Sequence, residues 1–262
     1  MADPNASETE KAMTSAISET APAAMPMPIF YTRPELLSSE RHSGKSLASR
    51  PDHRFTQGTN SVPLNGVELG LAQRVYPIVF SDEAAPFPMA ILGLRNAENL
   101  FLGSSGVWEG KAYIPAYIRR YPFVFTTGPD QKQYALCIDS ASASVIDGEA
   151  NPFFRDGKPT DLTKNALAFC ASFQAEYEKT RAFAAALTEH KLLDTRTADV
   201  DLGNGQKLVF GPFRVVDEDR LGALPDAVVA DWLRRGWLAW IHAHLLSSAN
   251  WMELANRLRV PA

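Results

Sequence analysis

Short apolar runs separated by Gly, Pro and Asn occupy residues 61 to 146, and this pattern predicts mostly β-strands. The predicted strands cover residues 75–80, 88–94, 100–102, 123–127 and 133–138. The last two flank Gly128-Pro129-Asp130 and should form a hairpin. Two short helices are expected, at 66–74 and at 112–120, where Pro115 is compatible only with a first helical turn. The polar segment 38–60 predicts an extended loop.

The hydrophobic period changes after residue 159, and the new spacing predicts a strong helix. Its apolar positions recur about once per helical turn, at Ala166, Phe169, Cys170, Phe173, Tyr177, Ala184 and Leu187. Thr160 or Asp161 is a suitable N-cap, because either side chain can accept hydrogen bonds from the first-turn N–H groups.

Three short runs and two helices are predicted beyond this helix. The runs at 197–202, 207–210 and 213–216 form a small antiparallel set in which Asn204-Gly205 is a hairpin turn. Pro225 at its start and Gly236 after its end mark a helix over 225–235. The last helix is predicted to run from about 237 to 258, with a broad apolar surface that suits two neighbours.

This order of elements indicates an α+β fold, with an antiparallel β-rich N-terminal half and C-terminal helices packed on it. Residues 1–28 are rich in Ala, Ser, Thr, Pro and Glu, so we expect a disordered tail there. Residues 29–262 are then expected to form a single domain.

Charge and composition exclude some classes of function. The 262 residues carry a formal net charge of −4, of which −3 lies in the first 28 residues. The nearly neutral remainder gives no basic field, so nucleic acid is not an expected partner. The longest apolar run, 237–246, is far shorter than the ~20 residues of a transmembrane helix. No export signal is apparent, which favours the cytoplasm and leaves export without a signal open.

Metal ligands and cofactor motifs are not apparent in the sequence, so neither a metal nor a cofactor is predicted. Cys137 and Cys170 lack CxxC spacing and are expected to be buried reduced thiols. His242 and His244 are two residues apart, roughly 200° around a helix, and cannot share one metal. Ser43-Gly44-Lys45-Ser46 looks like the end of a phosphate-binding loop, but position 39 is Ser39 rather than Gly.

The weak catalytic candidate is His244, acting with a carboxylate from the loop that follows the predicted hairpin. Acidic residues crowd that loop, at Asp139, Asp147, Glu149, Asp156 and Asp161. An acid–base pair would need a deep pocket in which His244 meets Asp139 or Glu149. The alternative is a core histidine bonded to backbone or hydroxyl groups, with the carboxylates in solvated turns.

The best binding candidate is the segment from Trp108 to Phe125, which places several aromatic residues beside two arginines. Tyr, Trp and Arg dominate binding hot spots, and paired guanidinium groups suit a carboxylate. The candidate binding residues are Asn96, Asn99, Trp108, Tyr113, Tyr117, Arg119, Arg120 and Tyr121. The alternative is that these aromatic residues form the core and the arginines lie at its edge.

Two stretches carry a resemblance to a known family: LGLRNAENLFLGSSGVWEGKAYIPAYIRRYPFVF at 92–125 and GWLAWIHAHLLSSANWMELANRL at 236–258. They resemble the SapC family of bacterial proteins, which is named after a surface-layer-associated gene. The resemblance covers about 28–258 and brings no catalytic residues to this chain. Genes of the family often lie near halogenase-like and outer-membrane receptor genes, which implies an accessory role.

We therefore expect a soluble, non-catalytic accessory protein that binds a peptide or protein partner, with an oligomer left open. An enzyme acting on a peptide or small molecule is the first alternative. A structural component of a surface layer is the second.

Overall fold

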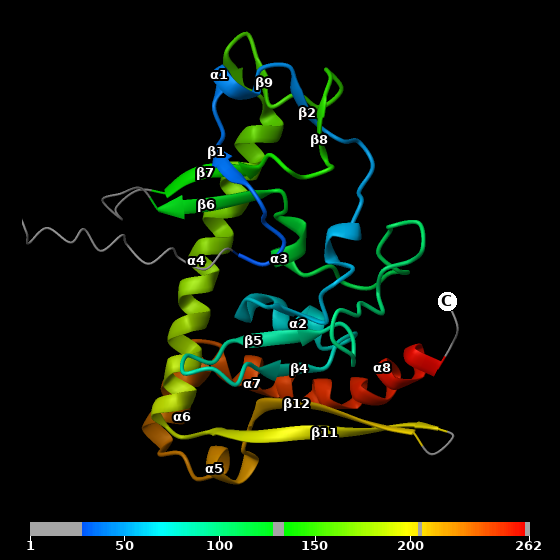
Figure 1. Cartoon of the computed structure of the whole chain (residues 1–262). Coiled ribbons are helices and arrows are strands. Elements are labelled where there is room, and N and C mark those ends of the chain that lie inside the picture. The colour runs from blue at the N-terminus through cyan, green and yellow to red at the C-terminus, as the bar shows by residue number, and fades with distance from the viewer. Residues whose placement is uncertain (1–27, 128–133, 204–205, 260–262) are drawn as a thin grey trace, which may run out of the picture.

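The computed structural model describes residues 28–127, 134–203 and 206–259. Apart from Pro28, the predicted disordered tail lies outside these residues, as do the turns predicted at 128–130 and 204–205. Figure 1 shows a small β-rich end, a larger end built on a sheet, and one long helix that runs beside both.

The smaller end is an antiparallel three-stranded sheet with two short strand pairs beyond it. The sheet has the order β1 (Pro34–Leu36), β7 (Tyr134–Asp139), β6 (Phe123–Thr127). The predicted hairpin strands pair in register from Phe123 opposite Ile138 to Thr127 opposite Tyr134. The short pairs are β2 (Lys45–Leu47) with β8 (Val145–Asp147), and β9 (Phe154–Arg155) with β10 (Lys158–Pro159).

The larger end contains a five-stranded sheet that combines strands from both halves of the chain. Its order is β11 (Leu193–Gly203), β12 (Gln206–Val216), β4 (Ile78–Phe80), β5 (Pro88–Ile91), β3 (Ser61–Pro63). All of its pairs are antiparallel. The set predicted at 197–216 is therefore one long hairpin joined to the N-terminal strands, and the fold is α+β as predicted.

The predicted central helix is confirmed as α4 (Asp161–Glu189), which contacts both ends of the molecule (Figure 1). Its residues enter three separate hydrophobic clusters, through Cys170, Phe173 and Phe183. The helices that follow α4 in the chain are α5 (Glu218–Gly222), α6 (Asp226–Arg234), α7 (Trp237–Leu246), η3 (Ser247–Ala249) and α8 (Asn250–Arg259).

Three predictions about elements need correction. The last helix is divided by η3, where Ser247 receives the Ile78 N–H at 2.9 Å and Asn250 donates to the Gln73 and Tyr76 carbonyls. Residues 100–102 are a turn with a single bridge between Leu102 and Trp108, rather than a strand. The extended loop predicted at 38–60 contains α1 (Ser39–His42), β2 and η1 (Arg54–Thr56).

Candidate functional site

Trp108, the first of the predicted binding aromatics, belongs to the largest core cluster. Its indole N–H donates to the Tyr76 hydroxyl at 3.1 Å, and its ring stacks on Phe101. Only 5% of Trp108 is exposed, so it cannot contact a partner in this conformation.

The two predicted asparagines have different surroundings. Asn99 is half-buried: its side-chain amide N–H donates to the Thr56 hydroxyl at 2.9 Å, and its side-chain oxygen accepts the Phe101 N–H at 3.0 Å. Asn96 is exposed, and both asparagines line a hollow of about 430 Å³ together with Arg54 and Arg95. Both arginines already pair with acids, Arg54 with Asp52 and Arg95 with Glu98.

A buried carboxylate that sequence reasoning missed, Glu68, positions the central part of the predicted site. It lies in η2 (Gly66–Glu68), which leads directly into α2 (Leu69–Ala72). One oxygen accepts hydrogen bonds from the Tyr113 hydroxyl at 2.8 Å and the Ala116 N–H at 2.6 Å, and the other accepts the Asn65 N–H at 2.9 Å. Burial raises the pKa of this carboxyl above its usual range.

These bonds fix the start of α3 (Ala116–Arg119), because Ala116 is its first residue. The pKa of Tyr113 is raised to about 12, chiefly by burial and then by Glu68, which keeps its hydroxyl a donor. The available sequence signal for Glu68 was its spacing from Asn65, since a Glu three residues after an N-cap Asn is a capping pattern.

Arg119 and Arg120 each lie between an aromatic ring of α4 and one of the segment 113–117. The Arg119 guanidinium carbon is 5.3 Å from the Phe169 ring centre and 5.6 Å from that of Tyr113. For Arg120 the distances are 4.4 Å to Phe173 and 4.3 Å to Tyr117. Phe169 and Phe173 are four residues apart on α4, so one face of that helix supports both arginines.

The two arginines differ in exposure. Arg119 is exposed and donates to the Ile114 carbonyl at 2.9 Å and to the Tyr113 hydroxyl at 3.1 Å. Arg120 is half-buried, and its Nε is sealed from solvent without a hydrogen-bond partner among the described residues. No carboxylate among the described residues forms an ion pair with the guanidinium group of Arg119 or of Arg120.

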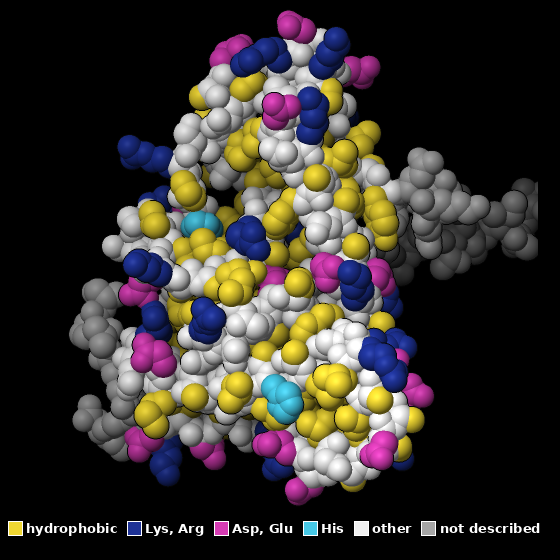
Figure 2. Space-filling model, turned by 180° about the vertical axis from the view of Figure 1, so that it is seen from behind, with side chains coloured by type: hydrophobic (Ala, Val, Ile, Leu, Met, Phe, Trp, Pro, Cys, Tyr) yellow, Lys and Arg dark blue, Asp and Glu magenta, His cyan; other side chains and the backbone are white. Residues whose placement is uncertain are grey.

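We name the accessible part of this region the arginine surface, defined by Tyr113, Arg119, Arg120 and Phe169. Figure 2, the view from behind, shows hydrophobic side chains open to solvent in the upper half of the molecule, with basic side chains beside them. In Figure 1, α3 lies beside the middle of α4, in agreement with the contacts of Arg119 with Phe169 and of Arg120 with Phe173.

The remaining predicted binding residues, Tyr117 and Tyr121, connect the start of the fold to this region. Tyr117 is buried, and its hydroxyl is 3.4 Å from the Ile29 carbonyl, to which it donates. Tyr121 stacks on Phe55 at 4.1 Å and donates to Asp139 at 3.2 Å.

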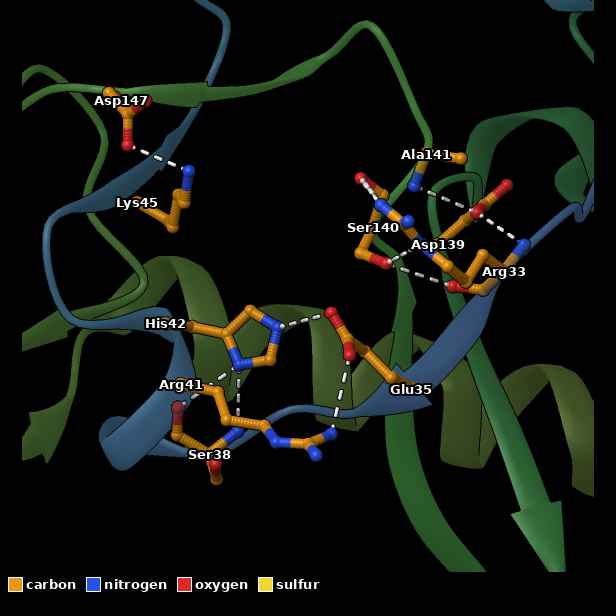
Figure 3. Close-up of polar contacts among 10 residues, drawn as sticks. All are labelled: Arg33, Glu35, Ser38, Arg41, His42, Lys45, Asp139, Ser140, Ala141 and Asp147. Carbon is orange, nitrogen blue, oxygen red and sulfur yellow. Dashed lines mark hydrogen bonds and ion pairs between the residues drawn. The ribbon is translucent and has the colours of Figure 1, made fainter.

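Asp139, one of the predicted loop carboxylates, holds the chain between residues 32 and 141. It is fully buried and accepts the N–H groups of Thr32, Arg33 and Ala141 at 2.9 to 3.2 Å. Figure 3 shows the Arg33 and Ala141 bonds converging on its carboxylate. All of these partners belong to the protein itself, so Asp139 is a structural carboxylate here.

The phosphate-loop-like sequence is also part of the scaffold. Lys45 pairs with Asp147 at 2.8 Å across β2 and β8 (Figure 3). The preceding His42 is buried, with Nδ1 beside the Ser38 backbone and Nε2 3.5 Å from Glu35. Glu35 also pairs with Arg41, so this histidine faces a carboxylate that is already bound.

His244 is inserted between two strands. Its Nδ1 is 2.8 Å from the Ile78 carbonyl, and its Nε2 accepts the Val216 N–H at 3.1 Å. A carbonyl only accepts, so Nδ1 carries the proton and both ring nitrogens are engaged. A cleft of about 500 Å³ beside it is lined by Asp217, Glu218 and Asp219, and neither Asp139 nor Glu149 lines it.

Other reactive groups give no catalytic arrangement within the described residues. No cluster of three or more His, Cys, Asp or Glu residues suits a metal there. Cys137 and Cys170 are buried and free, and burial raises the pKa of the Cys170 thiol to about 11, which disfavours a thiolate nucleophile. No helix in this part of the structure is long and apolar enough to cross a membrane.

These features define an α+β protein whose buried polar residues mainly hold the fold together, with one aromatic-supported pair of arginines at the surface. The SapC family model matches residues 37–254, and the chain belongs to the SapC family. Searches of the curated proteins and of the solved structures find no match.

Proposed function

We propose that this SapC family protein is a non-catalytic accessory protein that binds a peptide or protein partner at the arginine surface. The observation that carries the proposal is the pair of guanidinium groups supported by α4 aromatics and free of ion pairs with described carboxylates. Elsewhere in the described structure, Arg54, Arg95 and Arg214 are already paired with acids.

The chemistry of the arginine surface favours a carboxylate. Guanidinium groups bind carboxylates with two parallel hydrogen bonds, and aromatic support reduces the entropy lost on binding. Arg119 is the accessible donor, whereas Arg120 is packed between Tyr117 and Phe173. The partner is therefore expected to present an acidic side chain or a chain terminus to Arg119.

The experiment is capture of partners from native cells by the tagged protein, with the partner identified by mass spectrometry. Arg119→Glu should reduce capture at least tenfold, because it places a negative charge where the carboxylate binds. Arg234→Glu is the matched control: Arg234 is also exposed, lies in the last turn of a helix, and forms no ion pair with described residues. Equal capture by wild type and Arg119→Glu would refute the assignment of the site.

Arg119→Lys refines the test, since it retains the charge and removes the planar pair of donors. We expect it to capture less partner than wild type and more than Arg119→Glu. Arg120 is less suitable, because its substitution would also disturb the packing of Tyr31, Tyr117 and Phe173.

The alternative functions predict other outcomes of the same experiment. Recovery of the protein with a bound small molecule and no protein partner would favour an enzyme. Recovery from the cell exterior as a regular assembly would favour the surface-layer component. Light scattering of the purified protein identifies the case in which the partner is a second copy of this chain.

A further inference from the structure

We infer that the polar hollow between η1 and residues 95–104 binds the phosphate group of a small polar molecule. Its volume of about 430 Å³ is within the ordinary range of small-ligand sites. The side chains that carry the argument are Arg54, Gln57, Arg95, Asn96, Glu98 and Ser104. The hollow shares no residue with the arginine surface, so the inference does not depend on the proposed function.

The hollow combines positive charge with unused hydrogen-bond donors. Its two arginines and one glutamate give a net charge of +1. Arg54 donates from Nη1 to Asp52 at 2.7 Å and from Nη2 to the Ser105 carbonyl at 3.0 Å. Arg95 donates from Nη1 to Glu98 at 3.2 Å. A guanidinium group has five N–H donors, so these contacts orient both groups and leave each with further donors for a ligand.

The neutral side chains of the hollow are free to bind a ligand, whereas its carboxylate is not. Gln57, Asn96 and Ser104 are exposed, and their side chains form no hydrogen bond with described residues. Glu98 faces its own turn, where one oxygen accepts the Leu94 N–H at 3.2 Å and the Arg95 N–H at 3.1 Å. An anion in the hollow therefore meets unused donors, and the one carboxylate is already bound.

The two walls of the hollow are held together without a ligand. The Asn99 amide on one wall donates to the Thr56 hydroxyl on the other at 2.9 Å, in addition to the bond from Arg54 to residue 105. The turn at 93–98 is tight, because a side chain at Gly93 would collide with the Glu98 carbonyl. Ala97 has a φ of 57°, which residues other than glycine rarely adopt. A site formed in advance loses less entropy on binding.

The placement of the donors favours a phosphate over a carboxylate. Arg54 and Gln57 come from the wall that contains η1, and Arg95, Asn96 and Ser104 come from the opposite wall. A carboxylate presents two oxygens in one plane, whereas a phosphate monoester presents three acceptor oxygens around a tetrahedral centre. Arginine binds phosphate oxygens with paired hydrogen bonds, and two arginines on facing walls can bind different oxygens of one phosphate.

The test uses the full-length, ¹⁵N-labelled chain and follows the backbone amide NMR signals of Asn96, Ala97 and Ser104. The probes are glucose 6-phosphate and inorganic phosphate, with glucose as the uncharged counterpart, all at the same ionic strength. Both phosphate probes should shift the three signals saturably, and glucose should not. Absence of saturable shifts up to about 10 mM of either phosphate probe would overturn the inference.

Two variants test the position of the site, one on each wall. Gln57→Glu and Asn96→Asp preserve side-chain shape and place a negative charge in the hollow. Each should raise the Kd for glucose 6-phosphate at least about tenfold, because like charges repel. Asn165→Asp, which makes the same change at an exposed asparagine of α4, is the matched control and should bind as wild type does. Equal affinity in wild type and both hollow variants would refute the assignment.

Vesicles distinguish a lipid headgroup from a free phosphate ester. Phosphatidic acid carries a phosphate monoester, so it is added to phosphatidylcholine vesicles and compared with phosphatidylcholine alone. Retention of the protein only with phosphatidic acid, and its loss in Asn96→Asp, would identify a lipid source of the phosphate. Saturable NMR shifts without retention on vesicles would identify a free phosphate ester.

Arg119→Glu separates this inference from the proposed function. The variant should leave the phosphate-induced shifts unchanged, because Arg119 does not line the hollow. Saturable phosphate shifts together with unchanged partner capture in Arg119→Glu would refute the proposed function alone. Reduced partner capture in that variant, with no phosphate shifts in wild type, would refute the inference alone.

Discussion

At the scale of single residues, several polar side chains of this protein form hydrogen bonds with backbone groups that have no partner within the secondary structure. β4 and β12 form one register pair, Arg214 with Phe80, and the next pair in that register would be Val216 with Ile78. The His244 imidazole lies between these two residues and bonds to both. Ser247 satisfies the Ile78 N–H from the same side. The histidine thus continues the hydrogen bonding between β4 and β12, and its burial in an apolar helix needs no catalytic explanation.

The pH dependence of stability should report this role of His244. Burial lowers its pKa to about 4, against about 6.5 for an unfolded histidine. The neutral imidazole is therefore favoured in the folded state, and its stabilisation is fully present above about pH 6.5. As the pH falls from 6.5 toward 4, the unfolded chain takes up the proton first, and stability should decrease by about 3 kcal/mol in total.

Urea unfolding at pH 7.0, 5.5 and 4.5 checks this expectation. His244→Gln should be less stable than wild type at pH 7.0. The difference between their free energies of unfolding should become smaller by pH 4.5, because the variant lacks the imidazole whose protonation destabilises the wild type. His242→Gln, which changes an exposed histidine of the same helix, should retain the wild-type dependence. Parallel stability curves for wild type and His244→Gln would contradict the proposed role.

At the scale of elements, close approach between η2 and α7 fixes where Glu68 lies. Gly66 begins η2, donates its N–H to the Thr180 hydroxyl at 2.8 Å, and faces the ring of Trp240. η2 thereby touches α4 on one side and α7 on the other. The carboxylate that holds Tyr113 and α3 follows two residues later, so this contact helps to position the arginine surface.

A methyl group at residue 66 should therefore be destabilising. An ideal Cβ there would lie closer than van der Waals contact to the Trp240 ring, and overpacking of this kind costs about 1–3 kcal/mol. Gly70→Ala, in the adjoining helix α2, is the matched control. Gly70 is exposed, with no atom within 4 Å of an added Cβ, and should gain about 0.5–1 kcal/mol. Thermal unfolding measures the stability of both variants. Equal melting temperatures for Gly66→Ala and Gly70→Ala would contradict the prediction.

At the scale of the whole molecule, α4 connects hydrophobic clusters that otherwise belong to separate sheets. Cys170 packs with the cluster of β6 and β7, whereas Phe183 and Leu187 pack with Phe80, Trp232 and Trp237. Because one continuous helix supplies residues to both ends, breaking it at the middle should weaken both. This expectation tests the prediction that residues 29–262 form a single domain.

Ala175→Pro performs that test, because residue 175 is exposed and lies in the middle of α4. Proline there removes a helical hydrogen bond and clashes with the preceding turn, at a loss of about 3 kcal/mol or more. Hydrogen exchange should show reduced protection in β6–β7 and in β11–β12 alike.

The control for this variant is Asp161→Pro, at the first position of α4, where proline is tolerated. The extended backbone of Thr160, with ψ of 173°, also suits a residue that precedes proline. Unchanged protection of β11–β12 in Ala175→Pro would indicate two independent domains.

The sequence by itself determined the elements whose signals are local. The stripe of apolar residues predicted α4, the two short runs on either side of 128–130 predicted the hairpin strands, and Pro225 with Gly236 bounded α6. These predictions succeeded because helical periodicity, turn residues and helix-end residues are signals carried by neighbouring positions. The family resemblance succeeded for the same reason, since it rests on contiguous stretches.

Only the tertiary structure decided which polar and aromatic residues face solvent. Trp108 and Tyr117 are core residues, Arg119 is exposed, and Glu68 is the buried carboxylate beneath them. The break at η3 and the role of His244 depend on Ile78, which is more than 160 residues away in the chain. Burial and hydrogen-bond partners arise from contacts between distant segments, and no local pattern encodes them.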